Sequence, residues 1–260
     1  MITNVNDFYN GGRNLEDIFG NKPLKKLVEC LKNGDYTSFQ ENDYVIINKT
    51  IKLPTLDFNN TTYKDLVLKP NKLRIVGINF LNCHEEIENR VPNILFDFED
   101  INFMAPYNSD FTNVGGPFET PLLKYINSDE FLKVFCEYLD IDIDDIYNVY
   151  RYYDNGNVEL SCTCKEIKLF FPKAEEVYGS TDIATVAYKN NTLVWPLYQY
   201  LPISIIKKYD GERKWWWLNS SFKFNNQEFC YVCYNGGGGH GKSYYDDGVS
   251  LSFCLCSKNI

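Results

Sequence analysis

The chain has 260 residues, a length that suits one large domain or one domain with an appendage. Hydrophobic residues make up 44% of it and charged residues 23%, which excludes a wholly disordered polymer. The formal net charge of −9 argues against a broad footprint for nucleic acid, so no nucleic-acid partner is expected. No apolar run is long enough for a membrane span, and the first ten residues lack the pattern of a secretion signal.

The first residues are predicted to lie outside the main domain. Residues 1–22 contain three glycines and few apolar anchors, so we expect an N-terminal arm followed by one domain over residues 23–260. A flexible arm and an arm held by a neighbouring subunit both fit the sequence. Pro23 at the first helical position, apolar residues at helical spacing and the closing Asn33-Gly34 pair then predict a helix over residues 23–32.

A loop, two helices and several strands are predicted after this helix. Gly115 and Gly116 mark a loop over residues 113–117. From residue 129 to residue 150 the apolar side chains recur with a period of 3.6, which predicts two helices. Runs of β-branched and aromatic residues separated by turn residues predict strands over residues 44–47, 63–68, 73–80 and 93–104.

Four aspartates fall where the second of these helices is expected to begin, at positions 140, 142, 144 and 145. Helix capping and the helix dipole account for acidic residues at such a place. Calcium binding is the alternative, but the run lacks the central glycine and the terminal glutamate of an EF-hand loop.

The rest of the chain is predicted to be mostly extended. Alternating apolar residues indicate a strand within residues 157–171. A short helix is expected near residues 173–178, ending at Gly179. Polar and glycine-rich loops then join strands over residues 215–219, 229–234 and 248–256.

Aromatic residues make up 16% of the chain and include 20 tyrosines. Tyrosine combines a large rigid contact area with a polar tip, which is typical of recognition surfaces, although packing of a core explains any single tyrosine equally well. Three consecutive tryptophans cannot all face inward from one strand, because side chains alternate. Trp215 and Trp217 must share one face, and Trp216 is then either displayed for recognition or covered by the rest of a mixed domain.

Nine cysteines, an odd number, favour mostly reduced and buried thiols over a complete disulfide framework. Cys230, Cys233, Cys254 and Cys256 together offer four zinc ligands. The Cys-x-Cys spacing is also what a strand gives when alternate residues enter a core. Zinc is therefore kept as an alternative, and no cofactor is expected.

Catalysis has few candidate residues. Nucleophilic catalysis normally needs a positioned base, and the chain has two histidines, His84 and His240. His84 follows Cys83 directly, and adjacent residues rarely share a catalytic geometry. The string Gly236–Ser243 fits the letters of a phosphate-binding loop, but a strand rather than a helix is expected after it. We therefore predict a glycine-rich hairpin tip and no enzyme, with a nucleotide- or metal-dependent enzyme using this loop as the alternative.

Three segments carry a resemblance to a known family: residues 169–179 (LFFPKAEEVYG), 216–220 (WWLNS) and 247–251 (DGVSL). The pattern resembles a C-type-lectin-like domain of unknown function found in phages and prophages of Gram-positive bacteria. That domain is related in fold to formylglycine-generating enzymes and to receptor-binding proteins diversified by retroelements. Residues 31–36 and 76–78 extend the resemblance over residues 23–257. Asn219 and Ser250-Leu251 stand where the family pattern has arginine and arginine-proline.

The resemblance implies an α+β fold, a C-type-lectin-like mixed domain with short helices packed on antiparallel sheets. Sugar lectins that use calcium carry a Glu-Pro-Asn or Gln-Pro-Asp loop, which is absent here, so binding is expected to need no metal. The ligand-facing residues are expected after the Trp-Trp segment, together with Trp216 if its ring is displayed: Tyr234, Asn235, His240, Lys242, Tyr244, Tyr245 and Asp246.

The resemblance also implies a role on a phage particle. We expect a non-enzymatic virion surface protein, made in the cytoplasm of the bacterial host, whose arm docks to other virion proteins. Residues 219–247 are expected to face outward and to bind a glycan or a protein on the host cell. A capsid or tail decoration protein with mainly structural contacts is the alternative, and the formation of a homo-oligomer is left open.

Overall fold

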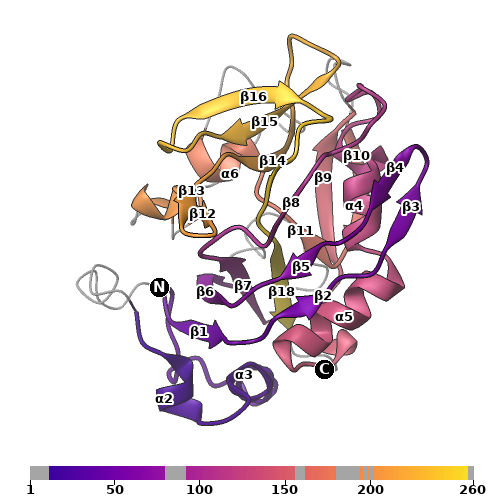
Figure 1. The fold of residues 1–260 in the computed structure, drawn as a ribbon. Coiled ribbons are helices and arrows are strands. Elements are labelled where there is room, and N and C mark those ends of the chain that lie inside the picture. Colours follow the sequence, from indigo (N-terminus) through magenta and orange to yellow (C-terminus); the bar gives the residue numbers. More distant parts are fainter. Residues whose placement is uncertain are drawn as a thin grey trace.

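The computed structural model describes residues 12–79, 92–155, 162–179, 194–195, 198–199 and 202–256. These residues form a mixed α+β fold, as the sequence predicts, in which short helices lie around sheets whose strand pairs are antiparallel except for one parallel pair (Figure 1). No helix among them combines the length and the apolar composition that a membrane crossing requires. The α-helices are α2 (Leu15–Phe19), α3 (Pro23–Lys32), α4 (Pro121–Ile126), α5 (Asp129–Leu139) and α6 (Ala174–Tyr178), and the 3₁₀ helices are η3 (Pro117–Glu119), η4 (Ile143–Asp145) and η5 (Pro202–Ile205).

Two five-stranded sheets form the body of the fold. The first sheet has the order β1 (Tyr44–Ile47), β6 (Asn71–Ile78), β7 (Asn93–Phe98), β18 (Ser252–Cys256) and β11 (Leu169–Phe170). The second has the order β16 (Gly238–Lys242), β15 (Glu228–Val232), β14 (Trp216–Ser221), β17 (Asp247–Val249) and β8 (Phe103–Ala105). The chain passes directly from one sheet to the next strand of the other at two places, from β7 to β8 and from β17 to β18. Through longer connections it also returns to the first sheet at β11 and enters the second again at β14.

Asn102 ties these two crossings together. Its side-chain oxygen accepts a hydrogen bond from the Leu251 N–H at 2.7 Å, and its own N–H donates to the Val249 carbonyl at 2.8 Å. Two-stranded hairpins complete the fold: β2 (Ile51–Lys52) with β5 (Val67–Leu68), β3 (Leu56–Phe58) with β4 (Thr61–Tyr63), β9 (Val149–Asp154) with β10 (Cys162–Ile167), and β12 (Lys208–Tyr209) with β13 (Glu212–Arg213).

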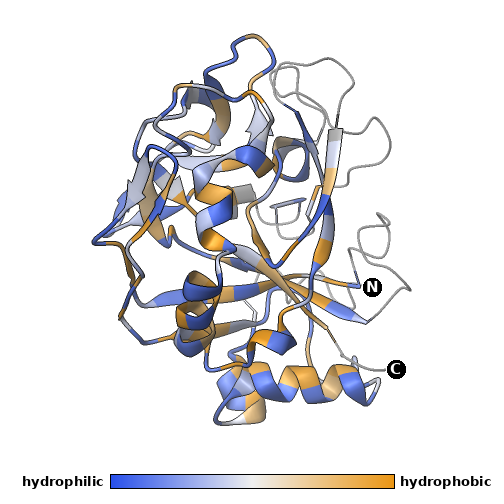
Figure 2. Cartoon of the chain, turned by 90° about the vertical axis from the view of Figure 1, so that its right-hand side faces the viewer, coloured by the Kyte–Doolittle hydropathy of each residue, from blue (hydrophilic) through white to orange (hydrophobic). Residues whose placement is uncertain are grey.

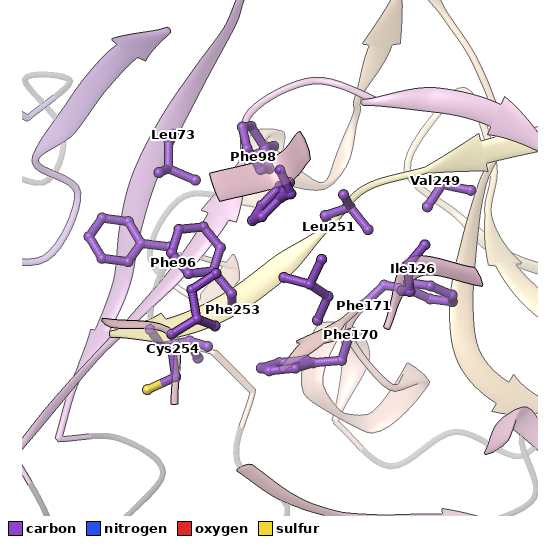
Figure 3. Packing of buried hydrophobic residues seen from close by; sticks show 14 of the residues in the cluster. Leu73, Phe96, Phe98, Ile126, Phe170, Phe171, Val249, Leu251, Phe253 and Cys254 are labelled. Atoms are coloured by element: carbon purple, nitrogen blue, oxygen red, sulfur yellow. The ribbon is translucent and has the colours of Figure 1, made fainter. Parts of the chain in front are cut away.

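The hydrophobic core is built around β7 and β18, whose residues are all buried. Figure 3 shows Phe96 of β7 beside Phe253 of β18, and their rings stack with centroids 5.3 Å apart. Phe135 of α5 meets the ring of Phe253 edge-on at 5.5 Å. Because both faces of these central strands are covered, their sequences are largely apolar instead of alternating.

The helices α3 and α5 form where the sequence predicts them. The hydroxyl of Ser128 begins α5 by accepting the Phe131 N–H at 3.3 Å, and Asp140, with a φ of 58°, ends it. Orange and blue residues alternate along the helices in Figure 2, as expected for helices with one buried face. The short helix α6 ends at Gly179, which has the positive φ of 79° that favours glycine.

The second helix predicted within residues 129–150 is wrong. Only the turn η4 is helical there, and β9 begins at Val149. The buried residues of β9 include Val149, Arg151 and Tyr153, an alternation of period two. The charge of Arg151 hides this alternation in the sequence, since an arginine is seldom buried. The acidic residues act as expected, because the Asp145 carboxylate accepts the Asp142 N–H at 3.1 Å and caps the turn.

Two predicted strands are shorter than expected. Residues 63–68 divide into the end of β4 and the strand β5, and residues 93–104 divide into β7 and β8. The break in the second run is the crossing between the two sheets. Its residues are apolar on both sides of the crossing, so hydrophobicity alone does not reveal it.

Residues 12–22 belong to the folded domain and not to an arm. Leu15 of α2 is fully buried, and the Arg13 carbonyl accepts the Tyr44 N–H of β1 at 2.9 Å. The Arg13 guanidinium also pairs with the buried Asp43 carboxylate at 2.6 Å. The predicted arm is therefore wrong for residues 12–22, and residues 1–11 lie outside the described part of the chain.

Candidate binding surface

The glycine-rich segment is a strand and not a loose hairpin tip. β16 pairs with β15 in register, with Gly239 opposite Tyr231. The turn between the two strands takes only the residues around Asn235 and Gly236, where the Gly236 N–H donates to the Cys233 carbonyl at 2.9 Å. Residues 243–256 contain a turn, β17 and β18 but no helix, so the phosphate-binding-loop alternative is wrong.

The glycines of β16 leave room for a tyrosine ring. A Cβ atom at Gly239 would lie 2.5 Å from Cε2 of Tyr231, and one at Gly241 would lie 2.8 Å from Cε1 of the same ring. The Tyr231 ring therefore lies flat along β16, in a position that any larger residue would block. This contact gives the repeated glycines a structural reason in place of phosphate binding.

Tyr231 in turn supports Trp215, and the two rings form what we call the aromatic stack. Their centroids lie 5.1 Å apart, with only 9° between the ring planes. Tyr231 is half-buried, whereas 39% of Trp215 is exposed. The stack thus presents a flat and rigid aromatic face to solvent.

Trp216 lies on the opposite face of the sheet and is completely buried. Its indole N–H donates to the Ile205 carbonyl at 2.9 Å, and the Lys207 ammonium lies 5.0 Å from its ring centroid. Of the two alternatives for Trp216, display for recognition is therefore wrong, and Trp216 is not a residue of the binding surface. The alternation of the three tryptophans is confirmed, but the displayed ring is Trp215.

A second group of rings lies along the turn that follows β16. Phe111 contacts Tyr244 with centroids 4.4 Å apart, and Tyr244 meets Tyr245 edge-on at 4.9 Å. Phe111 is 52% exposed and has a φ of 56°, which is rare for an aromatic residue and often marks a functional position. Together with the aromatic stack, these rings make the outer surface of this end of the molecule rich in exposed aromatic faces.

A polar cavity adjoins Phe111 on its loop. We call it the loop pocket; its volume is about 270 Å³, and its walls carry amide, hydroxyl and carboxylate groups with one lysine. Such groups offer hydrogen bonds to a hydroxyl-rich ligand. The lining residues are Asn59, Asn108, Asp110, Thr112, Val114, Glu119, Thr120, Pro121 and Lys124.

The residues predicted for the site are divided between the two faces of the second sheet. His240 faces away from the aromatic stack, lies parallel to Phe222 at 3.7 Å and pairs with Glu228 through Nδ1. Lys242 places its ammonium 5.8 Å from the Tyr244 ring centroid. The remaining predicted residues, apart from buried Trp216, lie at the surface, with Tyr244 half-buried and the others exposed: Tyr234, Asn235, Tyr244, Tyr245 and Asp246.

Sequence reasoning missed Trp215, Tyr231, Phe111 and Asp247. The glycine spacing in β16 is a signal for Tyr231, because alternate glycines on one strand leave space for a large ring on the next. Phe111 carries no comparable signal, since its contact with Tyr244 joins segments more than a hundred residues apart. Such a contact exists only in the folded chain.

Asp247 is a buried carboxylate beside this surface. Its Oδ2 atom has no hydrogen-bond partner. Burial, followed by the charge of neighbouring Asp246, raises the pKa of the Asp247 carboxyl to about 6. The Asp247 charge also contributes to the raised pKa values of Cys233 and Tyr231, for which burial is the larger cause.

The described residues contain no cluster of metal-ligating side chains. Cys230 lies in β15 of the second sheet, whereas Cys254 and Cys256 lie in β18 of the first sheet, so the four cysteines do not gather around one point. The zinc alternative is therefore wrong, and the aspartates around η4 form no calcium cluster either. Burial raises the pKa of Cys230, which makes it an inert thiol. Cys83 and His84 lie outside the described residues.

We expect Gly239→Ala to lower the free energy of unfolding by about 1–3 kcal/mol, because the added methyl group displaces the Tyr231 ring. Urea denaturation followed by tryptophan fluorescence measures the change. Gly237→Ala is the matched control, since its Cβ would meet only the movable Asn235 side chain at 3.3 Å. Equal stability of the two variants would show that Tyr231 does not depend on the glycine strand.

The three segments that resemble the lectin-like family lie against one another. Trp216 of β14 pairs with Gly248 of β17, and the Ala174 N–H of α6 donates to the Ser220 hydroxyl at 2.9 Å. Asn219, in place of the family arginine, bonds to the hydroxyl groups of Tyr107 and Tyr153 at 2.9 and 2.7 Å. Comparison of the chain with protein-family models, with curated proteins and with solved structures finds no match.

Proposed function

We propose that this chain is a non-enzymatic glycan-binding protein whose ligand lies on the aromatic stack of Trp215 and Tyr231. The single observation that carries the proposal is the stack itself, which is flat, partly exposed and held by a strand of glycines. Tryptophan and tyrosine rings supply large and rigid contact areas, which is typical of recognition surfaces. The carbon–hydrogen face of a sugar ring fits such an aromatic plane.

The surroundings of the stack suit a hydroxyl-rich ligand. Tyr245 and Phe111 supply further aromatic faces, and the loop pocket beside Phe111 supplies hydrogen-bond groups. These rings are held by one another, so little side-chain freedom is lost when a ligand binds. Rigid aromatic faces flanked by polar groups are typical of recognition surfaces.

The lectin-like fold and the location on a phage particle are further parts of the proposal. They rest on the family resemblance and are supported by the contact between its three segments around β14. In this proposal the protein needs no cofactor and joins other virion proteins through residues 1–11. The aromatic stack then faces a glycan on the host cell.

A glycan array probed with purified protein tests the proposal. Trp215→Ala is expected to weaken binding to the recognised glycan at least tenfold, or by about 1.4 kcal/mol, because the sugar loses its platform. Phe224→Ala is the matched control, since Phe224 is 69% exposed and packs edge-on against Phe222, beside His240, on the other face. The double variant Tyr244→Ala/Tyr245→Ala tests the second ring group.

The outcomes are distinct. Binding that survives Trp215→Ala unchanged would reject the aromatic stack as the site. A wild-type protein that retains no glycan but captures a host surface protein through the same residues would replace the glycan with a polypeptide ligand. We expect each variant to keep its fold, because Trp215 and Phe224 lie at the surface. Thermal unfolding of each variant checks this expectation.

A further inference from the structure

Asp247 is the residue of the binding surface whose burial is not explained by hydrogen bonds within the protein. The residue is only 8% exposed, and its Oδ2 atom is enclosed without a donor. A buried acceptor without a partner normally destabilises a fold, so such an atom calls for an explanation. At pH 7 the carboxyl is mainly ionised, because its pKa is about 6.

The register of the second sheet places Asp247 on the same face as the aromatic stack. Gly248 pairs with Trp216, so these two residues point to the face opposite Trp215. Asp247, one residue earlier, therefore points to the face of Trp215 and Tyr231. The Gly248 N–H donates to the Trp215 carbonyl at 2.9 Å, so the carboxylate lies next to the stack.

The charges around this point are negative. Burial and the charge of exposed Asp246 both raise the pKa of Asp247, and no basic group in the described residues opposes them. The nearest part of the turn holds one lysine, Lys242, whose ammonium lies over the ring of Tyr244. The Asp247 carboxylate thus lies beside the exposed Trp215 face. The chain neighbour of Trp215, Lys214, pairs with Glu212 at 2.8 Å.

We propose that the glycan bound at the aromatic stack carries a protonated amine, which is held between the Trp215 face and the Asp247 carboxylate. The inference rests on the proposed glycan-binding function and narrows its ligand to an amino sugar without an acetyl group on nitrogen. A cation gains energy from the aromatic face and from the carboxylate charge together. A neutral hydroxyl group gains the hydrogen bond alone.

A pair of matched oligosaccharides tests this inference. Isothermal titration calorimetry at pH 7 compares a glucosamine tetramer with an N-acetylglucosamine tetramer of the same linkage. We expect the glucosamine tetramer to bind at least tenfold more tightly to the wild-type protein. Asp247→Asn is expected to abolish this preference while leaving the weaker binding of the acetylated tetramer unchanged. The substitution removes an unpaired buried charge, so it is not expected to unfold the protein.

Asp17→Asn is the control for net charge, because Asp17 is exposed on α2 at the far end of the molecule (Figure 1). It should keep the full preference for the amine. Three outcomes would each contradict the proposal that the ligand carries a protonated amine: equal affinity of the two tetramers, binding of neither tetramer, or an equal loss of preference in Asp17→Asn. In these cases the proposed function still stands if Trp215→Ala removes binding on the glycan array, and it fails if that variant binds normally.

Discussion

Replacing Arg151 with methionine is expected to lower the free energy of unfolding by about 3–5 kcal/mol. Two guanidinium nitrogens of Arg151 each donate to the Glu176 carboxylate at 2.7 Å, and neither side chain is appreciably exposed. The guanidinium also lies 4.5 Å from the ring centroid of Phe170. Without the arginine, Glu176 remains buried with the Lys173 ammonium at 3.9 Å and the Lys173 N–H at 2.7 Å. A buried carboxylate that has lost two charged hydrogen bonds is the main source of the loss.

Urea denaturation at pH 7 measures this loss. The double variant Arg151→Met/Glu176→Gln should recover most of the lost stability, because residue 176 then carries no buried charge. Lys165→Met is the surface control, since its pair with Glu119 is exposed and is worth at most about 1 kcal/mol. A single variant Arg151→Met as stable as the wild type would mean that the ion pair does not hold β9 to α6.

The protein is expected to be more stable near pH 5 than near pH 8. Burial raises the pKa of Glu175 from an ordinary 4.5 to about 7, and that of Asp247 from 3.8 to about 6. Between these values the folded protein keeps protons that the unfolded chain has released, so its stability falls as pH rises. For Glu175 alone the fall is about 3 kcal/mol, and it is complete above the pKa of the folded state.

Thermal unfolding between pH 4.5 and pH 8 measures this dependence. Glu175→Gln/Asp247→Asn should flatten the curve and raise the melting temperature at pH 8, with little change at pH 5. Glu119 provides the contrast, because its pairs with Lys165 and Lys124 lower its pKa and its effect lies below pH 5. Stability that rises between pH 5 and pH 8 in the wild type would contradict the raised pKa values of both buried carboxyl groups.

The helices α3, α5 and α6 and the strand β1 were predictable from the sequence. Each is marked by a local pattern: Pro23 at the start of α3, Ser128 before α5 and Gly179 after α6. Capping and periodicity act over a few residues, so they can be read without knowledge of the fold. The mixed α+β class follows from the same local signals.

The candidate site was predictable only in part. The sequence indicates that aromatic residues of the last fifty positions form a recognition surface, and Tyr245 and Asp246 are indeed exposed there. It does not indicate which of three tryptophans is displayed, because alternation gives the relation between neighbouring residues and not the direction of the core. Trp216 is buried only because η5 and Lys207 cover that face.

The sequence by itself determined the fold class, the local helices and the alternation along β14, since these depend on interactions between residues close in the chain. The tertiary structure alone decided the burial of Arg151 against Glu176, the seating of Tyr231 on Gly239 and Gly241, and the isolation of the Asp247 carboxylate. The physical reason is that partners and solvent exposure at these positions come from segments distant in the chain. The sequence predicts a glycine-rich hairpin tip over residues 236–243, and only the folded chain shows the Tyr231 ring that lies on these glycines.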